Sequence, residues 1–213
     1  RRLENPPNPF ESSHVEWEGP PPDVRLDVYE ERAKSILSEN DSPDVAFRFS
    51  LNPYRGCFHG CIYCYARPTH QYLGFGAGSD FDRKIVVKVN APELLEARLS
   101  RRSWSGAPIA FSGNTDCYQP LEASYGLTRR CLEVCHAHGN PVGVITKGSV
   151  IRRDVDLLAA MHRRGGTRVA ISLAFSDDAM RQRFDPWAAP VGARLETIRR
   201  LADAGLPVGV AVA

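Results

Sequence analysis

The sequence has little that would mark a membrane-spanning, fibrous or disordered protein. It lacks any run of about 18 apolar residues, so no transmembrane helix is expected. Aromatic residues make up only 9% of the chain, beside 43% hydrophobic and 24% charged residues, which are ordinary values for a folded protein. The net charge of +2 is too small to indicate nucleic-acid binding through bulk charge, and no signal-peptide pattern is found. We therefore expect a cytoplasmic protein without a membrane partner.

Regular structure is predicted mainly after a proline-rich start. Prolines within 5–9 and 19–22 disfavour helices and central strands, so residues 1–45 are expected to form a loop-rich N-terminal arm with a short helix over 29–37. From residue 46, apolar runs alternate with helical periods, which predicts βαβ units and a parallel sheet. The predicted strands are 46–51, 108–112, 142–146, 168–173 and 208–213, with an extended segment at 84–89 and helices at 93–99, 127–138, 153–164 and 193–204.

Residues 46–213 are thus expected to form one α/β domain. The sequence starts at Arg1 and stops within the apolar run 207–213. A final strand without a following helix would expose an apolar edge, which proteins normally avoid. We expect this chain to be a piece of a longer protein whose domain continues beyond Ala213.

Three of the six cysteines lie in one short loop, at Cys57, Cys61 and Cys64, with the spacing C-x3-C-x2-C. Neighbouring thiolates repel one another unless a cation neutralises them, so a metal centre is expected. Three ligands are one short of a closed zinc site or a fully ligated cubane cluster. An alternative is structural zinc with His59 or His70 as the fourth ligand. That alternative is weaker, because zinc sites usually combine two short ligand pairs far apart in sequence.

The motif resembles the cysteine motif of the radical S-adenosylmethionine (SAM) superfamily, including Tyr63 immediately before the last cysteine. The wider segment 52–67, with 113–120 and Thr146-Lys147 further on, resembles the branch of that superfamily related to spore photoproduct lyase. The resemblance implies a partial (β/α)6 TIM-like barrel with about five strands in this chain. It also implies a [4Fe–4S] cluster on the three cysteines, with S-adenosylmethionine on the fourth iron. One electron from the cluster then yields a 5′-deoxyadenosyl radical that abstracts hydrogen from the substrate.

Ligands of parallel α/β folds collect at the carboxyl ends of the strands, where further cofactor contacts are expected. The resemblance implies that Lys147 pairs with the methionine carboxylate and that the segment containing Gly113 and Asn114 meets the amino group. The candidate cofactor-binding residues are Tyr63, Gly113, Asn114, Asp116, Lys147 and Ser172. Each could instead be a core, turn or solvated residue.

The other three cysteines are interpreted separately. Cys131 and Cys135 share one face of a predicted helix and are expected to be core residues, with a second metal site involving His136 or His138 as the alternative. Cys117 follows a strand end that is expected to face the active site. The resemblance gives it a candidate catalytic role as a hydrogen donor to a substrate radical.

The first functional hypothesis is a radical SAM enzyme that acts on a nucleic acid, in the manner of the photoproduct lyase. A second is a radical SAM enzyme for a peptide or a small molecule, and a third is a non-catalytic zinc-binding module. The enzyme hypotheses imply an electron donor of the flavodoxin or ferredoxin type. Iron with labile sulfide would distinguish them from a zinc module.

Overall fold

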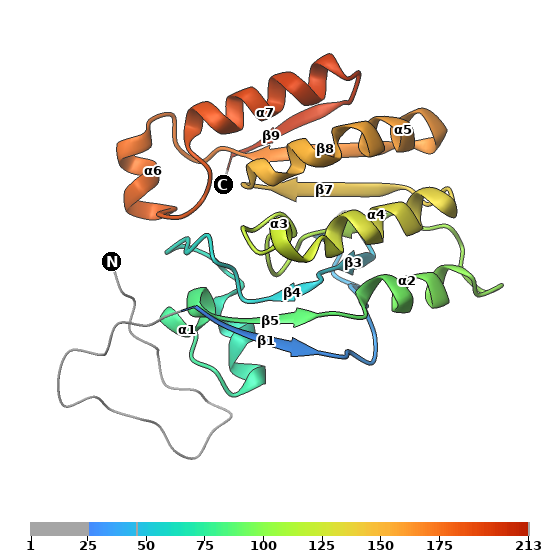
Figure 1. The fold of residues 1–213 in the computed structure, drawn as a ribbon, viewed down its shortest axis with the longest axis horizontal. Coiled ribbons are helices and arrows are strands. Elements are labelled where there is room, and N and C mark those ends of the chain that lie inside the picture. Colours follow the sequence, from blue (N-terminus) through green and yellow to red (C-terminus); the bar gives the residue numbers. More distant parts are fainter. Residues whose placement is uncertain (1–25, 46, 213) are drawn as a thin grey trace.

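The structure, a computed structural model, describes residues 26–45 and 47–212. In this part of the protein the chain forms a mixed α/β fold with two sheets (Figure 1). The proline-rich segment 1–23, predicted as a loop, lies outside the described residues. The domain boundary expected at residue 45 stays a prediction.

The larger sheet has six strands in the order β2-β3-β6-β7-β8-β9. β2 is antiparallel to β3, and each later pair in the order is parallel. The five parallel strands correspond to the five predicted from the sequence, which confirms the α/β class. Among the described residues no pairing between β2 and β9 closes the sheet into a barrel. The strands are β2 (Leu37–Glu39), β3 (Phe49–Leu51), β6 (Ile109–Phe111), β7 (Val142–Thr146), β8 (Thr167–Ser172) and β9 (Val208–Ala211).

The two faces of this sheet differ. In β7, Val142, Val144 and Thr146 are buried, whereas Ile145 between them is 46% exposed. Strand side chains alternate between faces, so the buried set packs under helices and Ile145 faces the opposite side. The same alternation in β8 buries Thr167, Val169 and Ile171.

Four helices lie next to one another along the covered face, as Figure 1 shows. They pack their apolar faces onto a core that includes Phe111, Leu132, Val144 and Leu158. Each corresponds to a helix predicted from the sequence, with shifts of one or two residues at the ends. They are α2 (Ala91–Leu99), α4 (Leu127–Ala137), α5 (Val155–Gly165) and α7 (Val191–Asp203).

A smaller sheet, β1-β5-β4, lies beside the first. Its strands are β1 (Asp27–Glu31), β4 (Tyr54–Arg55) and β5 (Lys84–Lys88). The helix predicted over 29–37 is wrong, because these residues contribute β1 and the start of β2 instead. β1 pairs in parallel with β5, a partner more than 50 residues away that local sequence does not reveal. The predicted extended segment at 84–89 is confirmed as β5.

Among the described residues, five short helical elements lie in the connections between strands of the same sheet. Two are 3₁₀ helices, η1 (Arg67–Leu73) and η2 (Ser149–Asp154). The others are α1 (Ser79–Arg83), α3 (Glu122–Tyr125) and α6 (Asp178–Phe184). Asp177 caps α6 by accepting a hydrogen bond from the Met180 N–H at 2.9 Å.

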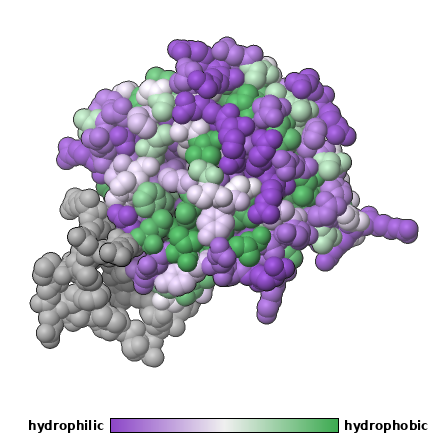
Figure 2. Space-filling view, in the orientation of Figure 1, coloured by the Kyte–Doolittle hydropathy of each residue, from purple (hydrophilic) through white to green (hydrophobic). Residues whose placement is uncertain are grey.

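The outer surface is mostly polar. On the face shown in Figure 2, hydrophilic residues predominate and small hydrophobic patches interrupt them. Across the described residues, no helix has both the length and the apolar character needed to cross a bilayer. Apolar burial is therefore concentrated in the core between the sheet and its helices.

Candidate functional site

The cysteine loop begins with a tight bend directly after β4. Gly56 has a φ of +78°, and a Cβ atom there would lie 2.9 Å from the Phe81 carbonyl oxygen. Only glycine fits both the left-handed backbone and this close approach. The bend directs the Cys57 N–H to the same Phe81 carbonyl, at 2.9 Å, and so anchors the start of the loop on α1.

Buried polar side chains fix the loop on its inner side. Arg67 donates to the Cys61 carbonyl from Nε at 3.0 Å and from Nη2 at 2.8 Å, and it forms a buried ion pair with Asp82. Gln119, fully buried, accepts from the Phe58 N–H at 3.0 Å and donates to the Gly56 carbonyl at 3.2 Å. These bonds satisfy loop backbone groups that no regular element pairs, so the loop has a defined shape.

A cavity of about 490 Å³ lies between this loop and the carboxyl ends of the strands. Its wall includes the three loop cysteines and residues from the ends of β6, β7, β8 and β9. The structure therefore brings together every cofactor-binding and metal-ligating residue predicted from the sequence, and these line the cavity: Cys57, Cys61, Cys64, Tyr63, Gly113, Asn114, Asp116, Lys147 and Ser172.

Asp116 connects the ends of β6 and β7. Its Oδ1 accepts from the Thr146 hydroxyl at 2.6 Å and from the Tyr118 N–H at 2.8 Å, while Oδ2 accepts from the Lys147 N–H at 2.7 Å. Burial raises the pKa of this carboxyl, but His59 and these hydrogen bonds outweigh it and lower the pKa to about 2. The carboxylate is therefore ionised, and it holds the backbone of Lys147 at the cavity.

His59 joins the cysteine loop to this arrangement. Its Nδ1 lies 3.3 Å from Asp116 Oδ2 in a buried ion pair, without the geometry of a hydrogen bond. Burial lowers the pKa of His59, but the charges of Asp116 and Cys57 more than offset this and raise it to about 10. From the sequence, His59 was expected only as a ligand of the alternative zinc site. Its contact with Asp116 links the loop to the strand ends.

Lys147 and Tyr63 face each other across the cavity. The Lys147 Nζ lies 5.6 Å from the centre of the Tyr63 ring, which is close enough for a cation–π contact. Tyr63 is 41% exposed, with an edge-on contact to Phe175 at 6.3 Å. The cavity thus presents the Lys147 ammonium group beside the partly exposed aromatic face of Tyr63.

The end of β6 carries backbone strain. Ser112 has a φ of +112°, and it is the one non-glycine residue with a positive φ among those the structure describes. Its hydroxyl donates to the Ile145 carbonyl at 2.5 Å, and Gly113 follows with a φ of +126°. The Tyr65 hydroxyl donates to the Gly113 carbonyl and so ties this strand end to the cysteine loop. Strain of this kind gathers at functional sites, where surrounding contacts hold it in place.

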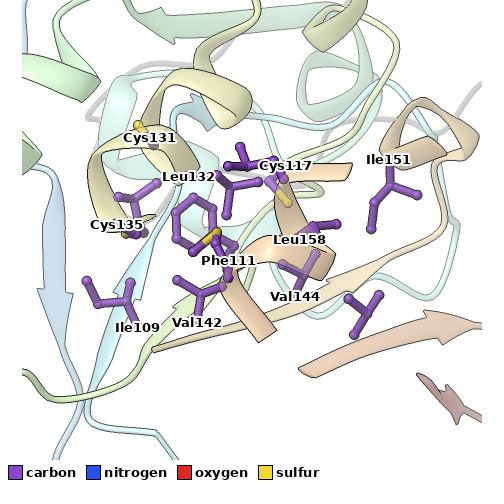
Figure 3. Close-up of a cluster of buried hydrophobic side chains, with 14 of the residues drawn as sticks. Ile109, Phe111, Cys117, Cys131, Leu132, Cys135, Val142, Val144, Ile151 and Leu158 are labelled. Atoms are coloured by element: carbon purple, nitrogen blue, oxygen red, sulfur yellow. The ribbon is translucent and has the colours of Figure 1, made fainter. Parts of the chain in front are cut away.

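The three remaining cysteines lie in the core. Cys117, Cys131 and Cys135 are fully buried among apolar side chains that include Phe111 and Leu132 (Figure 3). This confirms the predicted core position of Cys131 and Cys135. Cys117 does not line the cavity, and its Sγ lies 3.6 Å from the Ser112 hydroxyl on the buried side. The expected orientation of Cys117 toward the active site is not observed, and its catalytic role stays a prediction.

The three loop cysteines are free thiols. All six cysteines are free, and burial raises the pKa of the Cys61 and Cys64 thiols, so a bound cation is needed to keep them as thiolates. Within the described part of the chain, no three His, Cys, Asp or Glu side chains converge on one ion position. His70 bonds to the Lys84 carbonyl at 2.9 Å and does not line the cavity. Ligands to separate irons of a cluster need no single point of convergence.

Comparison with known proteins finds related sequences. An uncharacterized protein of Mycobacterium tuberculosis (strain ATCC 25618 / H37Rv) is 40% identical over 191 residues, which is 88% of this chain and 56% of that protein. An uncharacterized protein of Methanocaldococcus jannaschii is 22% identical over 182 residues, which is 85% of this chain and 65% of that protein. The chain thus spans little more than half the length of the mycobacterial relative.

Solved structures of spore photoproduct lyase share the fold. The lyase complexed with dinucleoside spore photoproduct matches with a TM-score of 0.65 and 20% identity over 95% of this chain and 58% of that chain. A mutant lyase with bound AdoMet and dinucleoside spore photoproduct matches with a TM-score of 0.62 and 22% identity over 88% of this chain and 51% of that chain. Residues 51–213 match the Radical SAM superfamily. The chain therefore belongs to the Radical SAM superfamily, a superfamily of enzymes.

Proposed function

We propose that the protein holds a [4Fe–4S] cluster on Cys57, Cys61 and Cys64 and binds S-adenosylmethionine in the adjoining cavity. One observation carries this proposal: three free cysteines of one loop line the same cavity as Lys147 and the carboxyl ends of four strands. When bound, the two groups supply one-electron cleavage of the sulfonium and hydrogen abstraction from the substrate, chemistry that amino-acid side chains lack.

The residues of the cavity would place and shield the cofactor. The Lys147 ammonium would bind the carboxylate of the methionine moiety, and the Tyr63 ring would pack near the adenine. Gly113 and Asn114 would offer polar backbone and amide groups, and the Ser172 hydroxyl would accept or donate a hydrogen bond. Asp116 has both carboxylate oxygens bonded to protein donors, so we assign it the positioning of Lys147 and not direct contact with the cofactor.

For the fold we propose a partial (β/α)6 TIM-like barrel. Five parallel strands in chain order support this, with helices on one face of the sheet and the cavity at the carboxyl ends. Ligand sites of α/β barrels lie at that end.

For the substrate class we propose nucleic acid. The supporting observation is that the protein shares its fold with spore photoproduct lyase, which has been solved with a dinucleoside photoproduct. A flavodoxin or ferredoxin type of reductant would supply the electron. A cytoplasmic location would keep the thiols reduced and the cluster intact.

Anaerobic reconstitution with iron and sulfide tests the proposal. We expect brown absorbance, bound iron with labile sulfide, and release of 5′-deoxyadenosine when dithionite and S-adenosylmethionine are added. Addition of damaged DNA should raise the yield of 5′-deoxyadenosine and alter the DNA. Stimulation by peptide or small-molecule fractions of a cell extract, without stimulation by DNA, would contradict the substrate class alone. Zinc without labile sulfide would contradict the whole proposal.

A further inference from the structure

A buried ion pair that the proposed function does not use lies directly behind the cavity wall. Asp185, just after α6, and Arg194, in α7, are 0% and 1% exposed. Arg194 Nη2 lies 3.2 Å from Asp185 Oδ2, and Arg194 Nε donates to the Ala189 carbonyl at 2.7 Å. Two complete charges are thus removed from water at one place.

The pair contacts one side of the candidate cofactor site through its arginine. Arg194 Nη1 donates to the backbone carbonyl of Ser172 at 2.9 Å. Ser172 is the last residue of β8 and lines the cavity. The guanidinium therefore fixes the carboxyl end of β8 at the point where a cofactor would meet it.

The other side of the pair contacts the cysteine loop. The Ile62 N–H donates to the Phe184 carbonyl at 2.9 Å, and the Trp187 N–H donates to the His59 carbonyl at 3.3 Å. Asp185 lies between the two bonded residues of one segment, and Cys61 lies between the two bonded residues of the other segment. In Figure 1, α6 and the segment that leads to α7 accordingly lie at the cysteine-loop end of the molecule.

One oxygen of the carboxylate has no partner. Asp185 Oδ1 is fully buried and has no hydrogen bond within the described residues. Burial raises the pKa of the Cys61 thiol most; Lys147 opposes this, and the negative charge of Asp185 adds to it. Replacing a buried ion pair by apolar residues is often neutral or stabilising, so this pair is weak evidence for a purely stabilising role.

We propose that Asp185 and Arg194 are positioning residues that hold the cysteine loop against the end of β8 and set the charge beside the Cys61 ligand. This inference rests on the proposed function. A carboxylate next to a thiolate ligand disfavours the addition of an electron to a cluster, and a neighbouring guanidinium offsets that effect. Groups behind the direct ligands tune metal centres in this way. The pair thus helps to determine the reduction potential of the cluster.

Redox titration of the reconstituted protein, followed by electron paramagnetic resonance of the reduced cluster, tests this inference. Asp185→Asn should shift the midpoint potential to more positive values, because a negative charge is lost. Arg194→Gln should shift it to more negative values, and Arg194→Lys should return it toward the wild-type value. Both neutral variants should also weaken S-adenosylmethionine binding, because the end of β8 is no longer fixed.

Asp154→Asn is the matched control. Asp154 is equally buried and paired with Arg129 and Arg153, but it does not line the cavity or contact the cysteine loop. The midpoint potential of the Asp154→Asn variant should match that of the wild type. If Asp185→Asn fails to fold, the two Arg194 variants make the same comparison.

Wild-type potentials in Asp185→Asn and Arg194→Gln, with unchanged cofactor affinity, would overturn the inference and leave the proposed function intact. Failure of the wild-type protein to take up any iron–sulfur cluster would overturn the proposed function itself.

Discussion

Gly60 in the cysteine loop lies directly under the indole of Trp187. A Cβ atom at residue 60 would overlap the six-membered ring of this side chain, well inside van der Waals contact. Trp187 is held from its other sides by Phe58, with ring centres 5.7 Å apart, and by Arg83, whose guanidinium lies 4.2 Å from the ring centre. These contacts restrain the indole, although it is 36% exposed.

Gly60→Ala should destabilise the protein and disturb the loop. Gly60 has a φ of +66°, so alanine would pay about 1 to 2 kcal/mol for the left-handed backbone and roughly 1 to 3 kcal/mol more for overpacking. Urea unfolding measures the loss. Gly106→Ala is the control, because Gly106 has a φ of +71° with nothing within 4 Å of an added Cβ. Equal losses in the two variants would show that Trp187 does not restrict residue 60.

Replacing Cys57, Cys61 or Cys64 by alanine should abolish the brown absorbance and the cleavage of S-adenosylmethionine. In the proposed site each thiolate would hold a different iron, so two ligands would not retain the intact cluster. Iron and sulfide analysis after reconstitution provides the measurement. Cys131→Ala, a change in the core, should keep the cluster. If Cys131→Ala loses the cluster while Cys61→Ala retains it, the ligand assignment is wrong.

Lys147→Ala should weaken S-adenosylmethionine binding roughly ten- to a hundredfold, because a charge-assisted contact contributes about 1.5 to 3 kcal/mol. Iron content should stay near the wild-type value, because the backbone N–H of residue 147, which bonds to Asp116, is unchanged. Equilibrium binding to the reconstituted protein measures the effect. Unchanged affinity would indicate that Lys147 is a solvated lysine that does not bind the cofactor.

Lys88 should make a contribution to stability that rises with pH in the alkaline range. Burial, with help from the Arg55 cation, lowers the pKa of Lys88 from 10.5 to about 8. Between about pH 8 and 10.5 residue 88 binds more protons in the unfolded chain than in the folded protein, so its own contribution to the free energy of unfolding increases with pH there. The buried Cys61 and Cys64 thiols, whose pKa values are raised, contribute in the opposite direction. Below about pH 8, where Lys88 is charged in the folded protein, its burial lowers the free energy of unfolding by about 3 kcal/mol.

Lys88→Met should remove this contribution, so the free energy of unfolding of the variant should fall more steeply with pH than that of the wild type. Urea unfolding from pH 7 to 10.5 in the presence of a reductant would reveal the difference. The exposed Lys34 provides the control, and Lys34→Met should keep the wild-type slope. A Lys88→Met variant with the same pH slope as the wild type would contradict the prediction.

The sequence predicted the parallel sheet well because the local pattern of residues identifies its central strands. The run from Val142 to Thr146 is apolar and β-branched and follows Pro141, and its observed bounds agree with the prediction. The first strand was misjudged, because Asp27–Glu31 is mostly exposed and becomes a strand only by pairing with β5. Local pattern carries no information on such distant pairing.

The residues of the candidate site that belong to sequence motifs were predicted. Those that are brought to the site only by contacts between distant segments were missed. Cysteine spacing and strand ends indicated the lining residues of the cavity. Asp185 and Arg194 were not singled out, although a buried Arg–Asp pair needs only two ordinary charged residues in the sequence. The partners of His59 and Gln119 lie about 60 residues away, so only the fold reveals them.

The order of strands in the larger sheet has a consequence for biosynthesis. From β3 to β9 the parallel strands lie side by side in the order in which the ribosome makes them. Each strand can therefore pair with an edge that already exists, and folding can keep pace with translation. The cysteine loop emerges from the ribosome long before Ser172 and Arg194, which later help to enclose it. The nascent protein thus presents the cysteine loop open and accessible, and encloses it only when the segments that carry Ser172 and Arg194 have been made.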